Sequence, residues 1–238
     1  MMKVFLKWCW ENKKNWKFIL NSKNSLYSNL QKTLSLKKSR FTGMLIEENS
    51  LDPSGFERWI FCRGMLFNSS QKWWGDHGRR DYPHEGIDLC LYQDRSGRIR
   101  RINENTRIPV MHDGVVKAMF KDFLGQAVII EHECSGSSTG RFLTFYAHTN
   151  PHPAIKVGKL VQEGDIIATL ADTRSSKSKI QPHLHFTLGI PAKSFSYEGF
   201  VWNRVRDPAM LILLDPLPVI NYPYQALDAD NPACRSKL

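Results

Sequence analysis

The chain has 238 residues, of which 42% are hydrophobic and 24% are charged, so it can bury the core of one domain and still carry additional segments. A formal net charge of +10 would suit a nucleic-acid-binding or membrane-binding protein if the basic residues were spread over the whole chain. Almost all of the excess lies in the first forty residues, and no RNA- or DNA-binding motif is present, which argues against a nucleic-acid-binding domain.

Residues 1–40 form a basic N-terminal arm, which contains ten lysines and arginines and one acidic residue and therefore holds +9 of the net charge. The arm is expected either to be a solvated leader or to associate weakly with an anionic membrane or wall polymer, an attraction that salt screens. Its longest apolar runs, at 4–6 and 18–20, are too short for the core of a signal peptide. No segment has the length of a transmembrane helix.

Residues 41–78 mix apolar stretches with glycine and serine and show neither helical nor strand periodicity. We therefore expect a loop-rich segment that leads into the main domain. Trp73 and Trp74 lie in this segment and can line a substrate groove, although packing in a buried core is the favoured interpretation.

Residues 79–190 have the texture of a mainly β domain, because short apolar runs rich in β-branched and aromatic residues alternate with Gly, Asp, Asn and Pro. The turn sequences at 112–114 and 163–165 favour an antiparallel sheet with short hairpins. The expected strands are 87–92, 108–111, 115–120, 127–131, 142–148, 166–170 and 184–188.

Residues 191–238 form a proline-rich C-terminal extension that is expected to wrap the surface of the domain, with a short helix over Asp207 to Leu214. The five cysteines of the chain are scattered and include no C-x-x-C pair, so most are expected to be free or buried thiols. They are Cys9, Cys62, Cys90, Cys134 and Cys234.

The sharpest local feature is His183-Leu184-His185. In a strand the two imidazoles point the same way, while Leu184 points into the core. One imidazole can then bind zinc through a neutral nitrogen, and its neighbour can hydrogen-bond a water molecule or a substrate oxygen. Two histidines on a solvated strand face would be the simpler interpretation if this pair stood alone.

His84 and Asp88 are spaced so that an imidazole and a carboxylate reach one face of an extended segment or a helix. Gly86 between them permits an unusual backbone angle or a close approach of substrate. With His185 they make a set of donors that suits zinc and leaves one coordination position for water. A surface ion pair is the alternative for His84 and Asp88.

Three motifs, in this order, resemble those of the lysostaphin-type (LytM-like) peptidoglycan endopeptidases: His84-x-x-x-Asp88, Tyr146-Ala147-His148 and His183-x-His185. The likeness covers residues 79–190 and implies the duplicated-hybrid-motif β fold of that family. It implies that one zinc ion is held by His84, Asp88 and His185, and that His148 and His183 flank the bound water as catalytic residues. The family also has an arginine ahead of the first motif, a place for which Arg79 and Arg80 compete.

The resemblance implies a zinc-dependent endopeptidase that cleaves peptide bonds in the stem peptides or cross-bridges of peptidoglycan. Such an enzyme is expected in the cell envelope or outside the cell, with the periplasm as the favoured place, although no clear signal peptide is present. The alternatives are a zinc-binding but non-catalytic cell-wall binder or activator, and a protease that acts on proteins. No specific nucleic acid is expected as a partner, and no oligomeric state is predicted.

Overall fold

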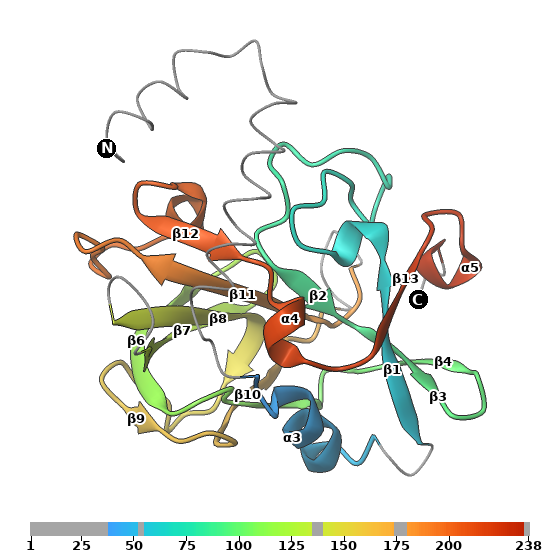
Figure 1. The fold of residues 1–238 in the computed structure, drawn as a ribbon, viewed down its shortest axis with the longest axis horizontal. Helices are drawn as coiled ribbons and strands as arrows, with labels where there is room; N and C mark the ends of the chain where they lie inside the picture. The colour runs from blue at the N-terminus through green and yellow to red at the C-terminus, as the bar shows by residue number, and fades with distance from the viewer. Residues whose placement is uncertain (1–37, 52–54, 135–139, 174–179, 236–238) are drawn as a thin grey trace. The chain divides into compact units, whose positions relative to one another are not determined.

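The computed structural model describes residues 38–51, 55–134, 140–173 and 180–235 (Figure 1). Most of the basic arm, residues 1–37, lies outside the described residues, so its expected association with a membrane or wall polymer stays a prediction. Within the described part of the chain, no helix is both long enough and apolar enough to cross a membrane.

The larger of two sheets has nine strands, all paired antiparallel, so the mainly β, antiparallel fold expected from the sequence is confirmed. Strands β12, β11, β8, β7, β6 and β9 lie in this order, while β2 pairs with β11 and β10 links β8 to β5 (Figure 1). The bounds are β2 Ile87–Leu89, β5 Arg107–Pro109, β6 Gly114–Lys121, β7 Gln126–Glu133, β8 Arg141–Pro151, β9 Leu160–Val161, β10 Ile166–Leu170, β11 Leu184–Pro191 and β12 Leu211–Leu214.

The smaller sheet has four strands in the order β13, β1, β3, β4. Their bounds are β1 Phe56–Cys62, β3 Leu91–Asp94, β4 Ile99–Arg101 and β13 Tyr224–Leu227. The single strand expected over 87–92 is therefore divided at Cys90, with β2 in the larger sheet and β3 in the smaller one. The backbone of Cys90 accepts a hydrogen bond from Ile102, and its thiol donates to the carbonyl oxygen of Pro182 at 3.6 Å.

Two stretches of the segment 41–78 are regular, so the expectation of a loop-rich segment is wrong there. They are the helix α3, Phe41–Glu48, and the strand β1. β1 lies between β13 and β3 and is buried from Trp59 to Cys62, so it lacks the alternation of apolar and polar residues that marks a half-exposed strand. With eight residues, α3 is too short for a clear helical period.

The C-terminal extension contributes a strand to each sheet, β12 to the larger and β13 to the smaller. The prediction of a short helix over Asp207 to Leu214 is wrong, because residues 211–214 form the strand β12, which pairs with β11. Without β12, the backbone donors and acceptors along this edge of β11 would be exposed. Pairing with β12 satisfies them. The remaining elements are short turns and helices: η1 Arg63–Met65, η2 Trp202–Arg206, α4 Leu217–Ile220 and α5 Pro232–Arg235.

The two faces of the larger sheet are covered by different parts of the chain. On one face, the ring of Phe186 on β11 stacks at 5.2 Å on Phe41 of α3. On the other face, a buried cluster joins the sheet to the C-terminal extension; its members are Ala118, Ile129, Leu143, Phe145, Phe195, Phe200, Val205 and Leu211. Thr187 is paired with Phe145, so His185, two residues earlier on β11, also points to this second face.

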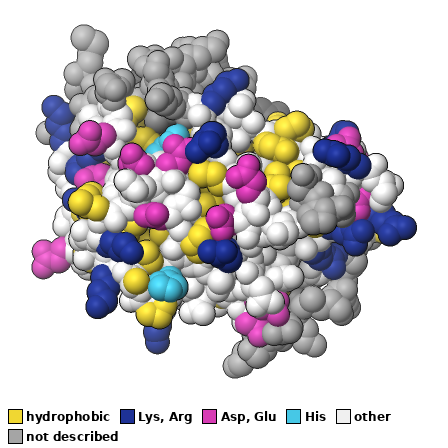
Figure 2. All heavy atoms as spheres, turned by 90° about the horizontal axis from the view of Figure 1, so that it is seen from below, with side chains coloured by type: hydrophobic (Ala, Val, Ile, Leu, Met, Phe, Trp, Pro, Cys, Tyr) yellow, Lys and Arg dark blue, Asp and Glu magenta, His cyan; other side chains and the backbone are white. Residues whose placement is uncertain are grey.

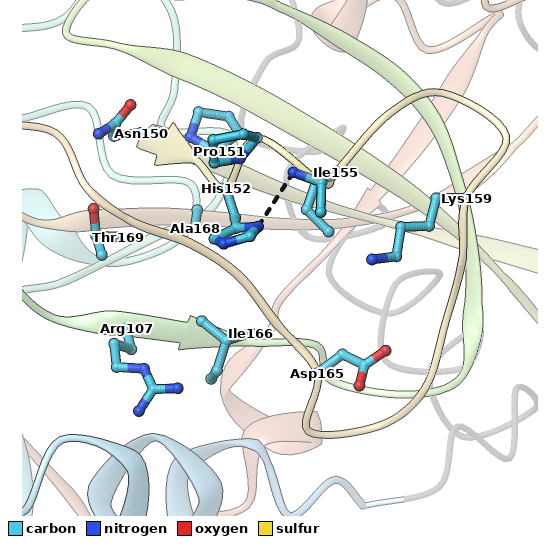
Figure 3. Close-up of a pocket in the computed structure, with 12 residues that line it drawn as sticks. Arg107, Asn150, Pro151, His152, Ile155, Lys159, Asp165, Ile166, Ala168 and Thr169 are labelled. Atoms are coloured by element: carbon cyan, nitrogen blue, oxygen red, sulfur yellow. Dashed lines mark hydrogen bonds between the residues drawn. The ribbon is translucent and has the colours of Figure 1, made fainter.

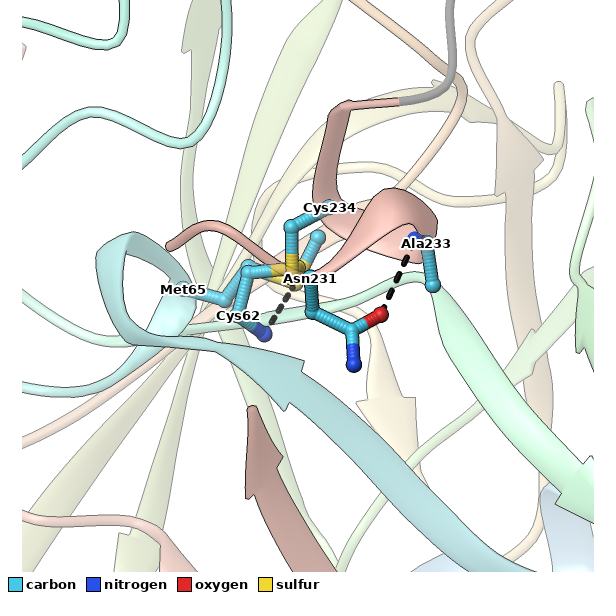
Figure 4. The surroundings of a disulfide bond; sticks show 5 residues. All are labelled: Cys62, Met65, Asn231, Ala233 and Cys234. Carbon is cyan, nitrogen blue, oxygen red and sulfur yellow. Dashed lines mark hydrogen bonds between the residues drawn. A yellow bond between two sulfur atoms is a disulfide. The ribbon is translucent and has the colours of Figure 1, made fainter. Parts of the chain in front are cut away.

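A disulfide joins Cys62 at the end of β1 to Cys234 in α5, with Cα atoms 5.6 Å apart (Figure 4). The expectation that the cysteines are mostly free thiols is wrong for this pair, whose 172-residue separation gives no spacing signal. Asn231 accepts a hydrogen bond from the backbone N–H of Ala233 at 3.0 Å and so begins the turn that carries Cys234. Among the described residues, Cys90 and Cys134 are free and buried.

Replacement of both Cys62 and Cys234 by serine is expected to lower the free energy of unfolding by about 2–4 kcal/mol, because the open chain gains conformational freedom when unfolded. Chemical denaturation of the oxidised protein measures the change, with Cys134→Ser as a control that removes a free thiol. Alkylation of Cys62 and Cys234 without prior reduction would contradict the pairing.

Candidate metal centre

Three donor atoms of His84, Asp88 and His185 converge on the second face of the larger sheet. Nε2 of His84 lies 3.1 Å from Oδ1 of Asp88 and 3.0 Å from Nδ1 of His185, and the last two atoms are 2.8 Å apart. The register of β2 on β11 sets Asp88 directly opposite His185. All three residues are buried. The structure thus brings together the three residues that the sequence suggested as metal ligands.

Gly86 allows the segment between His84 and Asp88 to lie against β11. A Cβ atom at this position would be 2.2 Å from the carbonyl oxygen of Phe186, so no other residue fits without a shift of the backbone. The sequence suggested that substrate could approach Gly86 closely; in the structure the backbone of β11 does so. This close approach places His84 beside the pair formed by Asp88 and His185.

Hydrogen bonds away from the centre indicate which nitrogen of each imidazole can carry the proton. Nδ1 of His84 lies 3.0 Å from the carbonyl oxygen of Leu66, which can only accept, so Nδ1–H donates and Nε2 keeps a free lone pair. The hydroxyl of Thr187 lies 3.0 Å from Nε2 of His185 and can accept its proton, which leaves Nδ1 of His185 free. In their neutral forms both histidines can therefore turn unprotonated nitrogens toward the centre.

The carboxylate of Asp88 is held from its outer side by Trp73. The indole Nε1–H donates to Oδ2 at 2.7 Å, and a guanidinium nitrogen of Arg80 lies 3.6 Å from the same oxygen. Burial raises the pKa of Asp88, but its close contacts with the imidazoles of His84, His183 and His185 lower it by more, so the pKa lies well below its usual range. Asp88 therefore presents a charged oxygen, Oδ1, to the centre.

Trp73 is buried, as favoured from the sequence, and its indole N–H also holds the carboxylate of the candidate ligand Asp88. Sequence reasoning missed this role because Trp73 lies fifteen residues before Asp88 and belongs to no motif. Of the two competing arginines, Arg80 approaches Asp88, and its guanidinium also lies 4.3 Å from the ring centre of Trp74.

His148 reaches the site through an irregularity in β8. The pairing of β7 with β8 shifts register between Gln126 and Val128, and His148 has a positive φ of 61°. A regular strand would turn His148 to the face of Tyr146, away from His185. With the bulge, its ring lies 4.8 Å from that of His183 and 5.7 Å from that of His185.

Asp122, which the sequence did not indicate, holds His148 in this position. One carboxylate oxygen accepts the backbone N–H of His148 at 2.7 Å, and the other lies 3.1 Å from its Nδ1. Burial raises the pKa of Asp122, but its hydrogen bonds with His148 lower it by more, so the net shift is downward. The pattern fixes Nδ1 as a donor and leaves Nε2 of His148 free.

His183 lies beside the three candidate ligands without joining them. Its Nδ1 donates to the carbonyl oxygen of Gln181 at 2.7 Å, and its Nε2 lies 3.9 Å from Oδ1 of Asp88. Burial lowers the pKa of His183 to about 3, so the ring is neutral near pH 7. His148 and His183 therefore each present an unprotonated nitrogen near the centre.

The donor set fits a zinc ion. In these neutral tautomers, Nε2 of His84, Nδ1 of His185 and Oδ1 of Asp88 are all acceptors about 3 Å apart, and a cation between them would satisfy all three at once. Two imidazoles and one carboxylate are donors that zinc accepts, and three protein ligands are typical of catalytic zinc sites.

Other candidate residues are engaged elsewhere. Burial raises the pKa of Cys90 to about 12, and its thiol bonds the Pro182 carbonyl, so Cys90 is a buried, inert thiol. His132 is buried, and its two ring nitrogens lie 2.9 Å from the carbonyl oxygen of Asp113 and 2.7 Å from the Thr144 hydroxyl. His152 lines a separate cavity of about 580 Å³ with Arg107 and other residues, none of which belongs to the candidate centre (Figure 3).

The sequence profile of peptidase family M23 matches residues 83–195, which include all five candidate residues. No curated protein sequence matches the chain.

Several solved structures are similar, among them the following three. A peptidase M23 candidate from Pseudomonas aeruginosa is 16% identical, with a TM-score of 0.36, over 74% of this chain and 60% of its own. Lysostaphin is 22% identical, with a TM-score of 0.35, over 57% of this chain and 51% of its own. The catalytic domain of the prophage-encoded M23 protein EnpA from Enterococcus faecalis is 23% identical, with a TM-score of 0.33, over 56% of this chain and 85% of its own. The chain thus spans between half and two thirds of the length of the first two.

Proposed function

Since the sequence profile of peptidase family M23 matches residues 83–195, we propose that this protein is a zinc-dependent endopeptidase that hydrolyses peptide bonds in peptidoglycan stem peptides or cross-bridges. The observation that carries the proposal is the convergence of three acceptor atoms from His84, Asp88 and His185, with two further imidazoles beside them. Family members that only bind the cell wall normally lack a ligand, whereas this chain has a candidate residue for each of the three ligand positions.

In this proposal His84, Asp88 and His185 hold the ion, and His148 and His183 carry out proton transfers. Bound zinc would lower the pKa of a water molecule and polarise the scissile carbonyl group. The free nitrogens of His148 and His183 can accept the proton of the attacking water or donate to the oxyanion that develops on the substrate. Asp122 keeps the free nitrogen of His148 turned toward the reaction, since it occupies the opposite nitrogen.

We also propose that the protein is located outside the cytoplasm. Disulfides persist in the periplasm and outside the cell, and the bond between Cys62 and Cys234 supports that setting. Peptidoglycan is inferred from the family. The same zinc chemistry would also serve a protease that acts on proteins, which is the alternative.

The face of the described residues drawn in Figure 2 does not favour a nucleic-acid-binding function. On the face drawn in Figure 2, lysine and arginine side chains are interspersed with aspartate and glutamate over most of the area. A nucleic-acid interface needs a patch or stripe of one sign, because the phosphate backbone supplies most of the affinity.

The purified chain is expected to contain about one zinc ion and to lower the turbidity of a peptidoglycan suspension, and a chelator should abolish the activity because three protein ligands hold the ion. Elemental analysis and light scattering with and without chelator measure both quantities. Readdition of zinc should restore lysis. Bound zinc without lysis of peptidoglycan would reject the proposed substrate, and a chain that takes up no zinc after reconstitution would reject the metal centre.

A further inference from the structure

The family match ends at residue 195, but a later part of the chain reaches the candidate metal centre. The short helix η2 sets the ring of Trp202 at 5.1 Å from that of His185, with an interplanar angle of 71°. The same indole lies 6.3 Å from the ring of Phe120 on β6. Trp202 is only partly buried, so it borders the metal centre while keeping exposed surface.

The position of Trp202 is fixed on both sides along the chain. Before it, Phe200 is buried against Phe145 on β8, and after it, Val205 is buried in the same cluster. A second attachment runs to the metal-binding segment. Glu85, which follows the ligand His84, accepts hydrogen bonds from Nε1 of Trp202 at 3.3 Å and from Nε of Arg206. A rigid aromatic side chain is thereby held beside a metal ligand by residues that take no part in the chemistry.

We propose that Trp202 is a specificity-determining residue that forms one wall of the substrate-binding cleft, where it packs against the peptide next to the scissile bond. The inference rests on the proposed function and assigns to the C-terminal extension a part in recognition that the matched segment 83–195 does not supply. The substrate class it fits is a peptide whose residue beside the cleavage point offers an apolar surface, because a flat indole ring binds by contact.

The hydrogen bond of the Trp202 indole indicates whether loss of the ring should change KM or kcat. Its only N–H group is directed at Glu85, so Trp202 gives the substrate apolar contact and no hydrogen bond. Such contact does not change as charge develops at the scissile carbonyl, so it stabilises the bound substrate and the transition state equally. Loss of the ring should therefore raise KM and leave kcat largely unchanged.

The test compares Trp202→Ala, Trp202→Phe and Tyr224→Ala in zinc-loaded full-length protein, with dye-labelled purified peptidoglycan as substrate. Tyr224 is a half-exposed aromatic residue on β13 in the other sheet and serves as the matched control. Zinc per chain is measured for each variant beside kcat and the half-saturating substrate concentration. Pelleting of each protein with intact peptidoglycan measures binding independently of turnover.

Trp202→Ala is expected to raise the half-saturating concentration roughly tenfold and to weaken pelleting by a similar factor, the loss expected for a large apolar contact. Zinc content should stay the same, Trp202→Phe should remain within about threefold of wild type because it keeps a ring, and Tyr224→Ala should match wild type. Unchanged binding in Trp202→Ala would overturn the inference, as would an equal defect in Trp202→Phe accompanied by loss of zinc. If the wild-type protein pellets with peptidoglycan but does not cleave it, the proposed function is rejected, while the pelleting assay still tests the role of Trp202. If the wild-type protein neither binds nor cleaves peptidoglycan, the proposed function and the role of Trp202 are both rejected.

Discussion

Replacement of His185 by alanine is expected to abolish zinc binding and hydrolysis together. In the proposed centre His185 supplies one of three protein donors, and its Nδ1 lies 2.8 Å from Oδ1 of Asp88 and 3.0 Å from Nε2 of His84. Without it, two donors remain, fewer than catalytic zinc sites use. Zinc per chain by elemental analysis and turbidity loss of peptidoglycan measure the two effects on the same preparation.

Trp73→Phe is the graded control for this experiment. It removes the hydrogen bond to Oδ2 of Asp88 but keeps all three ligands and an aromatic ring in the core. Loss of such an orienting bond typically weakens metal affinity about 10- to 100-fold, so this variant should still bind zinc when the ion is in excess. Hydrolysis by a metal-free His185→Ala protein would disprove the ligand assignment.

His148→Ala is expected to retain most of the zinc and to lose turnover by roughly two to four orders of magnitude, the usual contribution of a general acid or base. His148 lies outside the group of three converging donors, and Asp122 holds it with its free nitrogen near the centre. The loss should appear in kcat, because the imidazole acts on a proton that moves only during the reaction. Single-turnover kinetics on zinc-loaded protein separate this step from binding.

His152→Ala provides the matched control, since His152 lies in a cavity apart from the centre and its loss should leave both zinc and kcat unchanged. If His148→Ala lost its zinc in parallel with its activity, His148 would have to be counted among the ligands. If it kept full activity, His183 alone would have to move the proton.

The strands and the shared faces of the candidate ligands could be predicted because both follow from local periodicity. The expected strand 166–170 coincides with β10, and the alternation of side chains in an extended segment places His183, which immediately precedes β11, on the same face as His185 in β11. The spacing of His84 and Asp88 allowed them to share a face, and the pairing of β2 with β11 brings that face to His185. The structure thus adds the register that joins two motifs ninety-seven residues apart.

What the sequence did not reveal depends on long-range pairing. The bulge that turns His148 toward the centre arises where β7 and β8 shift register, and no residue type marks it. Trp73 and Asp122 act only through the residues they hold, so neither belongs to a motif. The short sequence 211–214 becomes a strand because it pairs with the edge of β11. The local sequence alone does not predict this pairing.

The bond between Cys62 and Cys234 closes a covalent ring around everything from β2 to β13, including the candidate centre and Trp202. A single cut by another protease anywhere inside this ring would leave both fragments attached to each other, so the two halves of the site could not diffuse apart. The basic arm precedes Cys62 and lies outside the ring. Its removal would therefore release only the arm and leave the closed loop of chain intact.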